Sequence, residues 1–235
     1  MPRAWVDEVR EGLKGVALAP EKSHRVGRRQ VALVTRYRYG VESKKLQTKD
    51  LIATGIFTAI YFVTMAVCGQ LGALIPILQV LGPLYIPIIC GIPFILFLTR
   101  VRVFGQIAIM GIVTGLLLIL TGQHWAGLVL AVVLAPLGDW IAARGGYKSW
   151  WGIVAGYAVF SELLIGMVVP LFFTRQTVLE RIGTRHDQAW VQQVADLTPP
   201  WMFLVMILMI VVGSAIGAYV GRVLLKKHFE RAGIA

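Results

Sequence analysis

The chain has 235 residues and a net charge of +11, and 57% of its residues are hydrophobic while 15% are charged. A soluble domain is roughly 45–50% apolar and about 25% charged, so this composition and a mean hydropathy of +0.73 exclude an ordinary soluble protein. Two cysteines are too few for a disulfide framework, and the four dispersed histidines indicate no bare metal site.

The first predicted element is a basic extension over residues 1–43, which precedes a membrane domain over residues 44–235. Residues 1–49 hold 12 Lys and Arg but only 5 Asp and Glu. Such a charge is attracted to anionic lipid at the cytoplasmic face of a membrane. A nucleic-acid partner is not expected, because no recognition motif accompanies the charge.

Six apolar stretches fill most of the chain from residue 51 onward, and each is close to the roughly 20 residues that a transmembrane helix needs. They are residues 51–69, 74–98, 104–120, 125–143, 150–173 and 201–225. The second stretch contains several prolines, which should bend or break its helix because proline removes a backbone donor. The predicted fold class is therefore all-α: a polytopic membrane protein built as a bundle of six transmembrane helices.

Basic residues mark alternate connections between these stretches. Lys and Arg precede the first stretch and follow the second, fourth and sixth, whereas residues 70–73 and 121–124 contain neither. Connections rich in Lys and Arg stay in the cytoplasm, so the N and C termini are both predicted to be cytoplasmic. Tryptophans at several predicted helix ends fit the aromatic belts of a membrane protein.

The one long connection, residues 174–200, is predicted to lie outside as a lid loop. Its apolar residues are spaced closely enough for one short amphipathic helix, and they are Val178, Ile182, Trp190, Val191 and Val194. A connection of this length in a compact domain is usually a functional lid or disordered. The apolar face favours the lid.

Glu162 is the most informative single residue, because it falls near the middle of the fifth stretch. A carboxylate that faces lipid at this depth is costly, so we expect Glu162 to face a cavity or a partner. Two interpretations stay open: a substrate contact or polar lock, and a protonated or paired structural residue. No Lys or Arg lies at matching depth in another stretch, and the candidate neutral partners are Gln79, Gln106 and Tyr157.

Two further polar features lie near the ends of the fourth stretch. Gln123, His124 and Trp125 form the turn before it, and an amide, an imidazole and an indole together suit a flat polar ligand. The alternative for this turn is a solvated loop with an interfacial tryptophan. Asp139 lies near the other end with Arg144 close behind, where we expect a local ion pair, with a partner-subunit contact as the alternative.

Small residues gather at two places. Ala53, Gly55 and Ala59 lie on the first stretch, and small residues at such spacing let another helix approach closely, although the spacing also occurs by chance. Glycines recur every fourth residue in the sixth stretch, over residues 213–221. We predict that these glycines serve packing inside the bundle.

Four segments of the chain resemble the Trep_Strep family, also described as MptD-family S components of energy-coupling factor (ECF) transporters. They are TKDLIATGIFTAIYF at residues 48–62, YAVFS at 157–161, LTPPWM at 197–202 and GRVLLKKHFERAGI at 221–234. The resemblance implies a membrane-embedded binding subunit with a small-molecule substrate. It also implies two kinds of partner, a transmembrane coupling subunit (EcfT-like) and two ATPase subunits.

The resemblance also implies roles for particular residues. In ECF S components, small residues on the first span meet the coupling subunit, which implies that Ala53, Gly55 and Ala59 bind that partner here. The substrate site of such proteins lies toward the outside, among the later spans and under the outer loops. Carried over, the implied substrate-binding residues are Gln70, Gln79, Gln123, His124, Trp125, Tyr157, Glu162, Arg181, Arg185 and Trp190.

The expected function is that of an S component, which captures a small micronutrient for ATP-driven uptake across the plasma membrane of a bacterium. One alternative is a self-sufficient secondary transporter with Glu162 as proton carrier, and another is a membrane scaffold that binds no small molecule. The chain has no P-loop, HExxH or GxSxG motif, so we expect neither an enzyme nor a cofactor. Because the resemblance starts near residue 44, we expect the native start at or near Val41, with residues 1–43 an artefact of gene calling.

Overall fold

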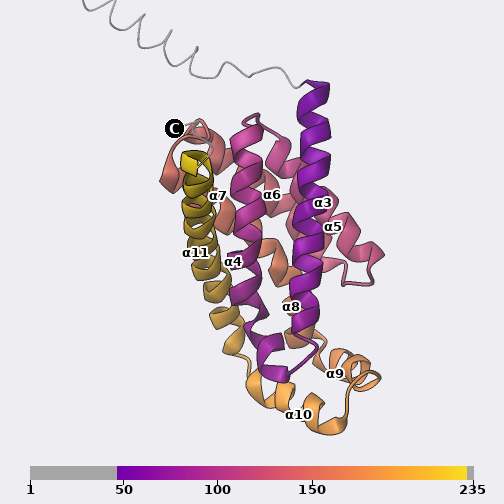
Figure 1. Cartoon of the computed structure of the whole chain (residues 1–235). Coiled ribbons are helices and arrows are strands. Elements are labelled where there is room, and N and C mark those ends of the chain that lie inside the picture. Colours follow the sequence, from indigo (N-terminus) through magenta and orange to yellow (C-terminus); the bar gives the residue numbers. More distant parts are fainter. Residues whose placement is uncertain (1–46, 232–235) are drawn as a thin grey trace, which may run out of the picture. The chain divides into compact units, whose positions relative to one another are not determined.

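The computed structural model describes residues 47–231, so the basic extension over residues 1–43 and the expected start at Val41 lie outside the described residues. Within residues 47–231 all regular elements are helices and none is a strand, which confirms the all-α prediction (Figure 1). The elements in chain order are α3 (Thr48–Leu71), α4 (Pro76–Arg100), α5 (Gln106–Leu120), α6 (Ala126–Arg144), α7 (Trp150–Ser161), the 3₁₀ turn η1 (Glu162–Leu164), α8 (Ile165–Phe173), α9 (Arg175–Gly183), α10 (Gln188–Leu197) and α11 (Met202–Arg231).

Five of the described helices are long and apolar enough to cross a membrane. They are α3, α4, α6, the continuous stretch from α7 through α8 (Trp150–Phe173) and α11 over Met202–Lys227. The third predicted span is the shorter helix α5, which has 15 residues. At about 1.5 Å per residue, α5 is roughly 22 Å long, which is less than the roughly 30 Å of a hydrocarbon core.

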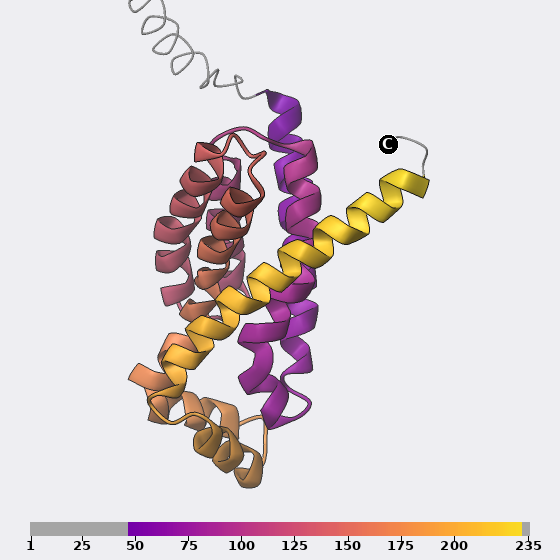
Figure 2. The ribbon, with the colours of Figure 1, turned by 90° about the vertical axis from the view of Figure 1, so that its left-hand side faces the viewer.

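The long helices run up and down, so that their ends gather at two opposite ends of the bundle (Figures 1 and 2). We call one of them the basic end, because its exposed side chains include Lys49, Arg100, Arg102, Arg144, Lys148 and Arg222. The opposite end carries α9 and α10, and we call these two helices the cap. Figure 1 shows the cap beyond the first turns of α4 and the last turns of α8.

Helices α4 and α11 approach each other at backbone distance, and Figure 2 shows α11 crossing α4. A Cβ atom added to Gly217 would lie 2.4 Å from the carbonyl oxygen of Pro87, and one added to Gly213 would lie 2.3 Å from that of Leu84. A Cβ atom added to Gly221 would likewise lie 2.9 Å from the carbonyl oxygen of Gly91. The prediction that these glycines serve internal packing is therefore confirmed.

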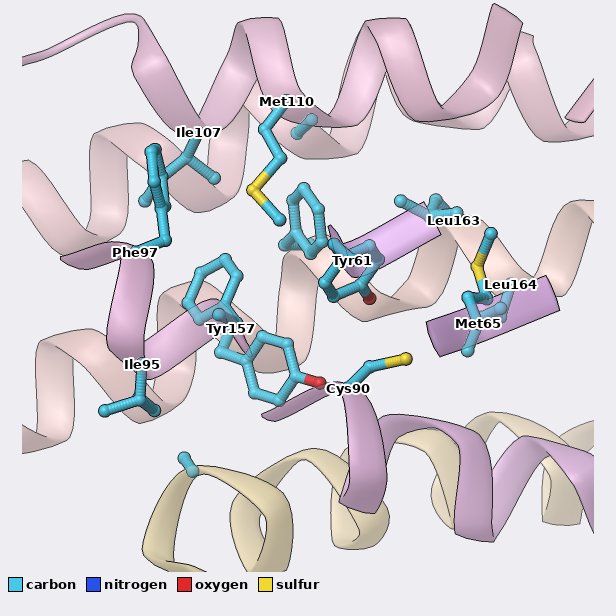
Figure 3. Close-up of a cluster of buried hydrophobic side chains, with 14 of the residues drawn as sticks. Tyr61, Met65, Cys90, Ile95, Phe97, Ile107, Met110, Tyr157, Leu163 and Leu164 are labelled. Carbon is cyan, nitrogen blue, oxygen red and sulfur yellow. The ribbon is translucent and has the colours of Figure 1, made fainter. Parts of the chain in front are cut away.

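The prolines do not break α4, which remains one helix from Pro76 to Arg100 with three prolines inside it. Helix α4 contributes Phe94 to an aromatic core, where its ring centroid lies 4.3 Å from that of Tyr157 and 5.2 Å from that of Phe160. Tyr61 of α3 completes the group edge-on to Phe160, at 5.5 Å. These buried rings join α3, α4 and α7 in the hydrophobic core, where Figure 3 labels Tyr61 and Tyr157.

Asp139 holds the basic end together, and its contacts correct the expected ion pair with Arg144. The fully buried carboxylate accepts hydrogen bonds from the backbone N–H groups of Gly105 at 2.8 Å and Ala108 at 3.2 Å, and from the Tyr147 hydroxyl at 2.5 Å. It therefore satisfies orphan donors at the start of α5. The Arg144 guanidinium instead lies 3.5 Å from the ring centroid of Trp140.

Candidate functional site

The cap is the clearest candidate for a functional element. The sequence predicted one amphipathic helix in residues 174–200, but the structure has two, α9 and α10. The second helix begins where the Asp187 carboxylate accepts a hydrogen bond from the Trp190 backbone N–H, at 2.8 Å. Val194 of α10 is fully buried, and α10 packs against α4. The predicted apolar face therefore exists, but the turn before Asp187 divides it.

Arg175 fastens the two ends of the cap to each other. From the first residue of α9, its guanidinium donates hydrogen bonds to the carbonyl oxygens of Ala195 at 2.5 Å and Thr198 at 2.7 Å. These carbonyls lie in the last turn of α10 and at the residue that follows it, where the negative end of the helix dipole attracts a cation. The only sequence feature that points to this role is the position of Arg175 two residues after an apolar span.

A groove lies beside this contact at the root of the cap. It has a volume of about 460 Å³ and is lined by Phe172, Phe173, Arg175, Pro200 and Phe203. The Phe172 and Phe203 ring centroids are 5.3 Å apart in an edge-on arrangement. Aromatic walls with one guanidinium suit a ligand that has an apolar body and a hydrogen-bond acceptor.

Arg175→Gln is expected to loosen the cap. The substitution removes charge-assisted hydrogen bonds to two carbonyl groups, each worth about 1.5–3 kcal/mol. Amide hydrogen exchange in residues 188–197 should therefore accelerate by roughly tenfold or more, as measured by mass spectrometry. Arg181→Gln is the matched control, because Arg181 is exposed on α9. Equal exchange in both variants would contradict the fastening role.

Four of the implied substrate-binding residues, on α3, α4 and the turn before α6, are exposed. Gln70, Gln79 and Gln123 are exposed, and Trp125 has 63% of its surface exposed. The Nδ1 atom of His124 accepts a hydrogen bond from the Ala126 backbone N–H at 3.2 Å. This contact closes the local turn, so the structure favours the solvated-turn interpretation for His124.

The predicted cap residues separate into two kinds. Arg181 and Arg185 are exposed, whereas Trp190 is half-buried. The Trp190 ring stacks on His186, with ring centroids 4.0 Å apart and an angle of 11° between the planes. The indole Nε1 of Trp190 is buried, and no hydrogen-bond partner for it lies in the described part of the chain. His186 is the neighbour that sequence reasoning missed.

Tyr157 and Glu162 do not line one site. Tyr157 is fully buried and its hydroxyl donates to the Pro87 carbonyl oxygen at 2.7 Å. Glu162 is half-buried at η1, and its Oε1 has no hydrogen-bond partner among residues 47–231. The two residues are five positions apart, which turns them by about 140° around a helix, so they point to different sides.

The prediction that Gln79, Gln106 or Tyr157 is the neutral hydrogen-bond partner of Glu162 is wrong. Gln106 lies at the basic end, where its Oε1 accepts a hydrogen bond from the Thr54 hydroxyl. Gln79 is exposed beside Gly72, and the Tyr157 hydroxyl is taken by α4. The depth of the Glu162 carboxyl group in its span could be predicted from the sequence, but the residues around it could not.

Of the small residues on α3, Ala53 is half-buried while Gly55 and Ala59 are exposed. A Cβ atom added to Gly55 would meet nothing within 4 Å. The side of α3 that carries Gly55 and Ala59 is thus uncovered in this chain, and we call it the open face of α3.

Together the apolar helices define a multi-pass integral membrane protein with a helical cap at one end. Residues 48–231 match the Trep_Strep family, described as hypothetical bacterial integral membrane proteins, and the chain belongs to this family. The plasma membrane of a bacterium fits such a protein. No curated protein matches the chain, and no solved structure does.

Proposed function

We propose that this chain is the substrate-binding S component of an ECF-type importer. It captures a small micronutrient outside the cell, and a transmembrane coupling subunit with two ATPase subunits drives release of the micronutrient inward. In this proposal α5 is a short sixth span, and both termini are cytoplasmic. The chain itself binds and presents its substrate, and it performs no enzymatic step.

The observation that carries the proposal is the open face of α3. Among the five long helices α3 is the least buried, with 28% of its apolar window covered by the rest of the chain. Gly55 and Ala59 on this face leave room for the backbone of another helix. Small residues at an uncovered position support close packing with a partner helix in the membrane.

The cap supports the capture step. It covers the end of the bundle opposite the basic end, and Arg175 fastens it. The basic end is typical of a cytoplasmic surface by the distribution of Lys and Arg, which leaves the cap outside. A ligand that enters from outside therefore meets the groove at the root of the cap first, between Phe173 and Phe203.

The test compares membrane vesicles that contain this chain alone with vesicles that also contain the coupling and ATPase subunits of the source bacterium. Mass spectrometry of compounds that co-purify with the chain identifies the substrate to be labelled. The labelled compound should bind to both preparations, but it should accumulate only with all subunits and ATP. Sustained accumulation by the chain alone would instead support a secondary transporter, and the absence of any bound compound would support a scaffold.

Gly55→Leu is expected to abolish uptake while leaving substrate binding unchanged. The isobutyl group enters the open face of α3, so it blocks the partner helix without disturbing this chain's own packing. The matched control is Gly55→Ala, which adds one methyl group and should assemble normally. Co-purification of the coupling subunit measures assembly, and full assembly of Gly55→Leu would contradict this use of the open face.

A further inference from the structure

Among the described residues that line the groove at the root of the cap, Arg175 alone is charged. Its hydrogen bonds all go to uncharged oxygens, which are the carbonyl groups of Ala195 and Thr198 and the Thr198 hydroxyl. A guanidinium has five N–H groups, and these bonds use Nη1 twice and Nη2 once. The Nε–H group and the second Nη2–H group therefore have no partner within residues 47–231, and we call these two groups the free edge of Arg175.

The carboxylates of the cap do not neutralise Arg175. Asp187 accepts a hydrogen bond from a backbone N–H group at the start of α10. Asp196 is exposed and accepts one from the Gln192 amide at 3.0 Å, and Glu180 is exposed on α9. None of the three acidic residues bonds to Arg175 in the part of the chain that the structure describes. The positive charge of the guanidinium is therefore available to attract an anion.

The helix ends around the groove do not supply the missing negative charge either. Helices α8 and α10 end at the root of the cap, and α9 and α11 begin there (Figure 1). Each helix end carries a partial charge of about half a unit, negative where a helix ends and positive where it begins. These contributions nearly cancel, so the charge at the groove is close to the single positive charge of Arg175.

The remaining walls of the groove are mainly phenyl rings. Phe203 meets Phe172 edge-on, and it meets Phe173 in the same way, with 6.1 Å between the ring centroids and 87° between the planes. Phe173 is 75% exposed, so the rest of the chain leaves most of its ring uncovered. Another flat aromatic ring can cover it, because aromatic rings attract each other in offset-stacked and edge-on arrangements.

We propose that the groove binds a monocarboxylate that carries an aromatic ring, with the carboxylate on the free edge of Arg175 and the ring against Phe173. A guanidinium can donate two parallel hydrogen bonds to the two oxygens of a carboxylate. One positive charge matches one carboxylate, whereas a phosphate group carries nearly two negative charges and would leave an excess. The inference deepens the proposed function and rests on it, because it takes the groove as the place of substrate capture.

A matched pair of ligands tests the carboxylate. The probes are cinnamate and its neutral amide, cinnamamide, which share the same phenyl ring and side chain. Titration of the purified chain in an uncharged detergent, followed by saturation-transfer NMR, gives both dissociation constants. Cinnamate should bind roughly tenfold more tightly or better, in line with charge-assisted hydrogen bonds to the carboxylate. Equal affinities, tighter binding of the amide, or binding of neither probe would overturn the proposal.

Three variants separate the carboxylate contact from the fastening of the cap, through the ratio of the cinnamamide dissociation constant to that of cinnamate. Arg175→Gln should reduce this ratio to about one, even where a looser cap weakens binding of both probes. Phe173→Ala should weaken both probes and keep the ratio, because the guanidinium stays. Arg100→Gln is the control for net charge, since Arg100 is exposed at the basic end, and it should keep the wild-type ratio. A ratio that survives Arg175→Gln refutes the contact.

A lipid headgroup also carries an anion, so the titration is repeated in two kinds of nanodisc. One contains only zwitterionic phosphatidylcholine, and the other also contains anionic phosphatidylglycerol. Cinnamate should bind with the same affinity in both. If phosphatidylglycerol abolishes cinnamate binding, a headgroup occupies Arg175 and the groove is a lipid site instead.

The uptake experiment keeps this inference apart from the proposed function. ATP-driven accumulation of a compound that has no carboxylate would refute the carboxylate site and leave the S component in place. A preference for cinnamate in a chain that supports no ATP-driven accumulation of its co-purified compound would do the reverse.

Discussion

Gly217→Ala is expected to destabilise the whole helix bundle. The added Cβ atom would lie 2.4 Å from the Pro87 carbonyl oxygen and 2.8 Å from that of Ile88. Both atoms belong to the backbone of α4, so relief requires the two helices to separate. Overpacking of this kind costs about 1–3 kcal/mol and sometimes more. Thermal unfolding of the purified protein in detergent should show the loss as a clearly lowered midpoint.

The control for this prediction is Gly69→Ala on α3. A Cβ atom at Gly69 meets nothing within 4 Å, so the same chemical change adds a methyl group to open space. Its unfolding midpoint should equal that of the wild-type protein or exceed it slightly. If Gly217→Ala unfolds at the same temperature as Gly69→Ala, the close contact between α4 and α11 does not stabilise the bundle.

The long helices were predictable because a segment that crosses a membrane must satisfy its backbone hydrogen bonds internally, so a long apolar stretch forms a helix. Proline was a weaker guide in α4, which stays helical through Pro83, Pro87 and Pro93. Proline is tolerated inside membrane helices, and α4 is also joined to α7 by the hydrogen bond from the Tyr157 hydroxyl to the Pro87 carbonyl oxygen. Sequence reasoning could not supply this partner, because Tyr157 lies on another helix.

The contacts that hold the cap and the basic end were less predictable than the spans, because they join distant parts of the chain. Asp139 meets the start of α5, and Arg175 meets the end of α10. A single sequence shows no sign of either pairing. For Glu162, the depth in the membrane span could be predicted from the sequence, but the side of the helix on which the residue lies could not. The 3₁₀ turn at Glu162–Leu164 interrupts the regular α-helical rotation between α7 and α8.

The basic end should depend on Asp139 more than on any other charged residue described. Its carboxylate is the acceptor for two backbone N–H groups and for the Tyr147 hydroxyl. Burial raises the pKa of Tyr147, and the adjacent Asp139 raises it further, so the phenol remains a donor at every physiological pH. Asp139→Leu would leave these donors buried without an acceptor.

An unsatisfied buried donor costs about 1–3 kcal/mol, so Asp139→Leu should lower the free energy of unfolding by several kcal/mol. Tyr147→Phe removes one donor and leaves the backbone bonds in place, so its effect should be about 1 kcal/mol. Asp196→Ala is the control, because Asp196 is exposed on the cap and bonds to Gln192. Thermal unfolding should rank the variants Asp139→Leu below Tyr147→Phe below Asp196→Ala. A Tyr147→Phe protein less stable than Asp139→Leu would show that Tyr147, rather than the start of α5, is the group that the carboxylate chiefly supports.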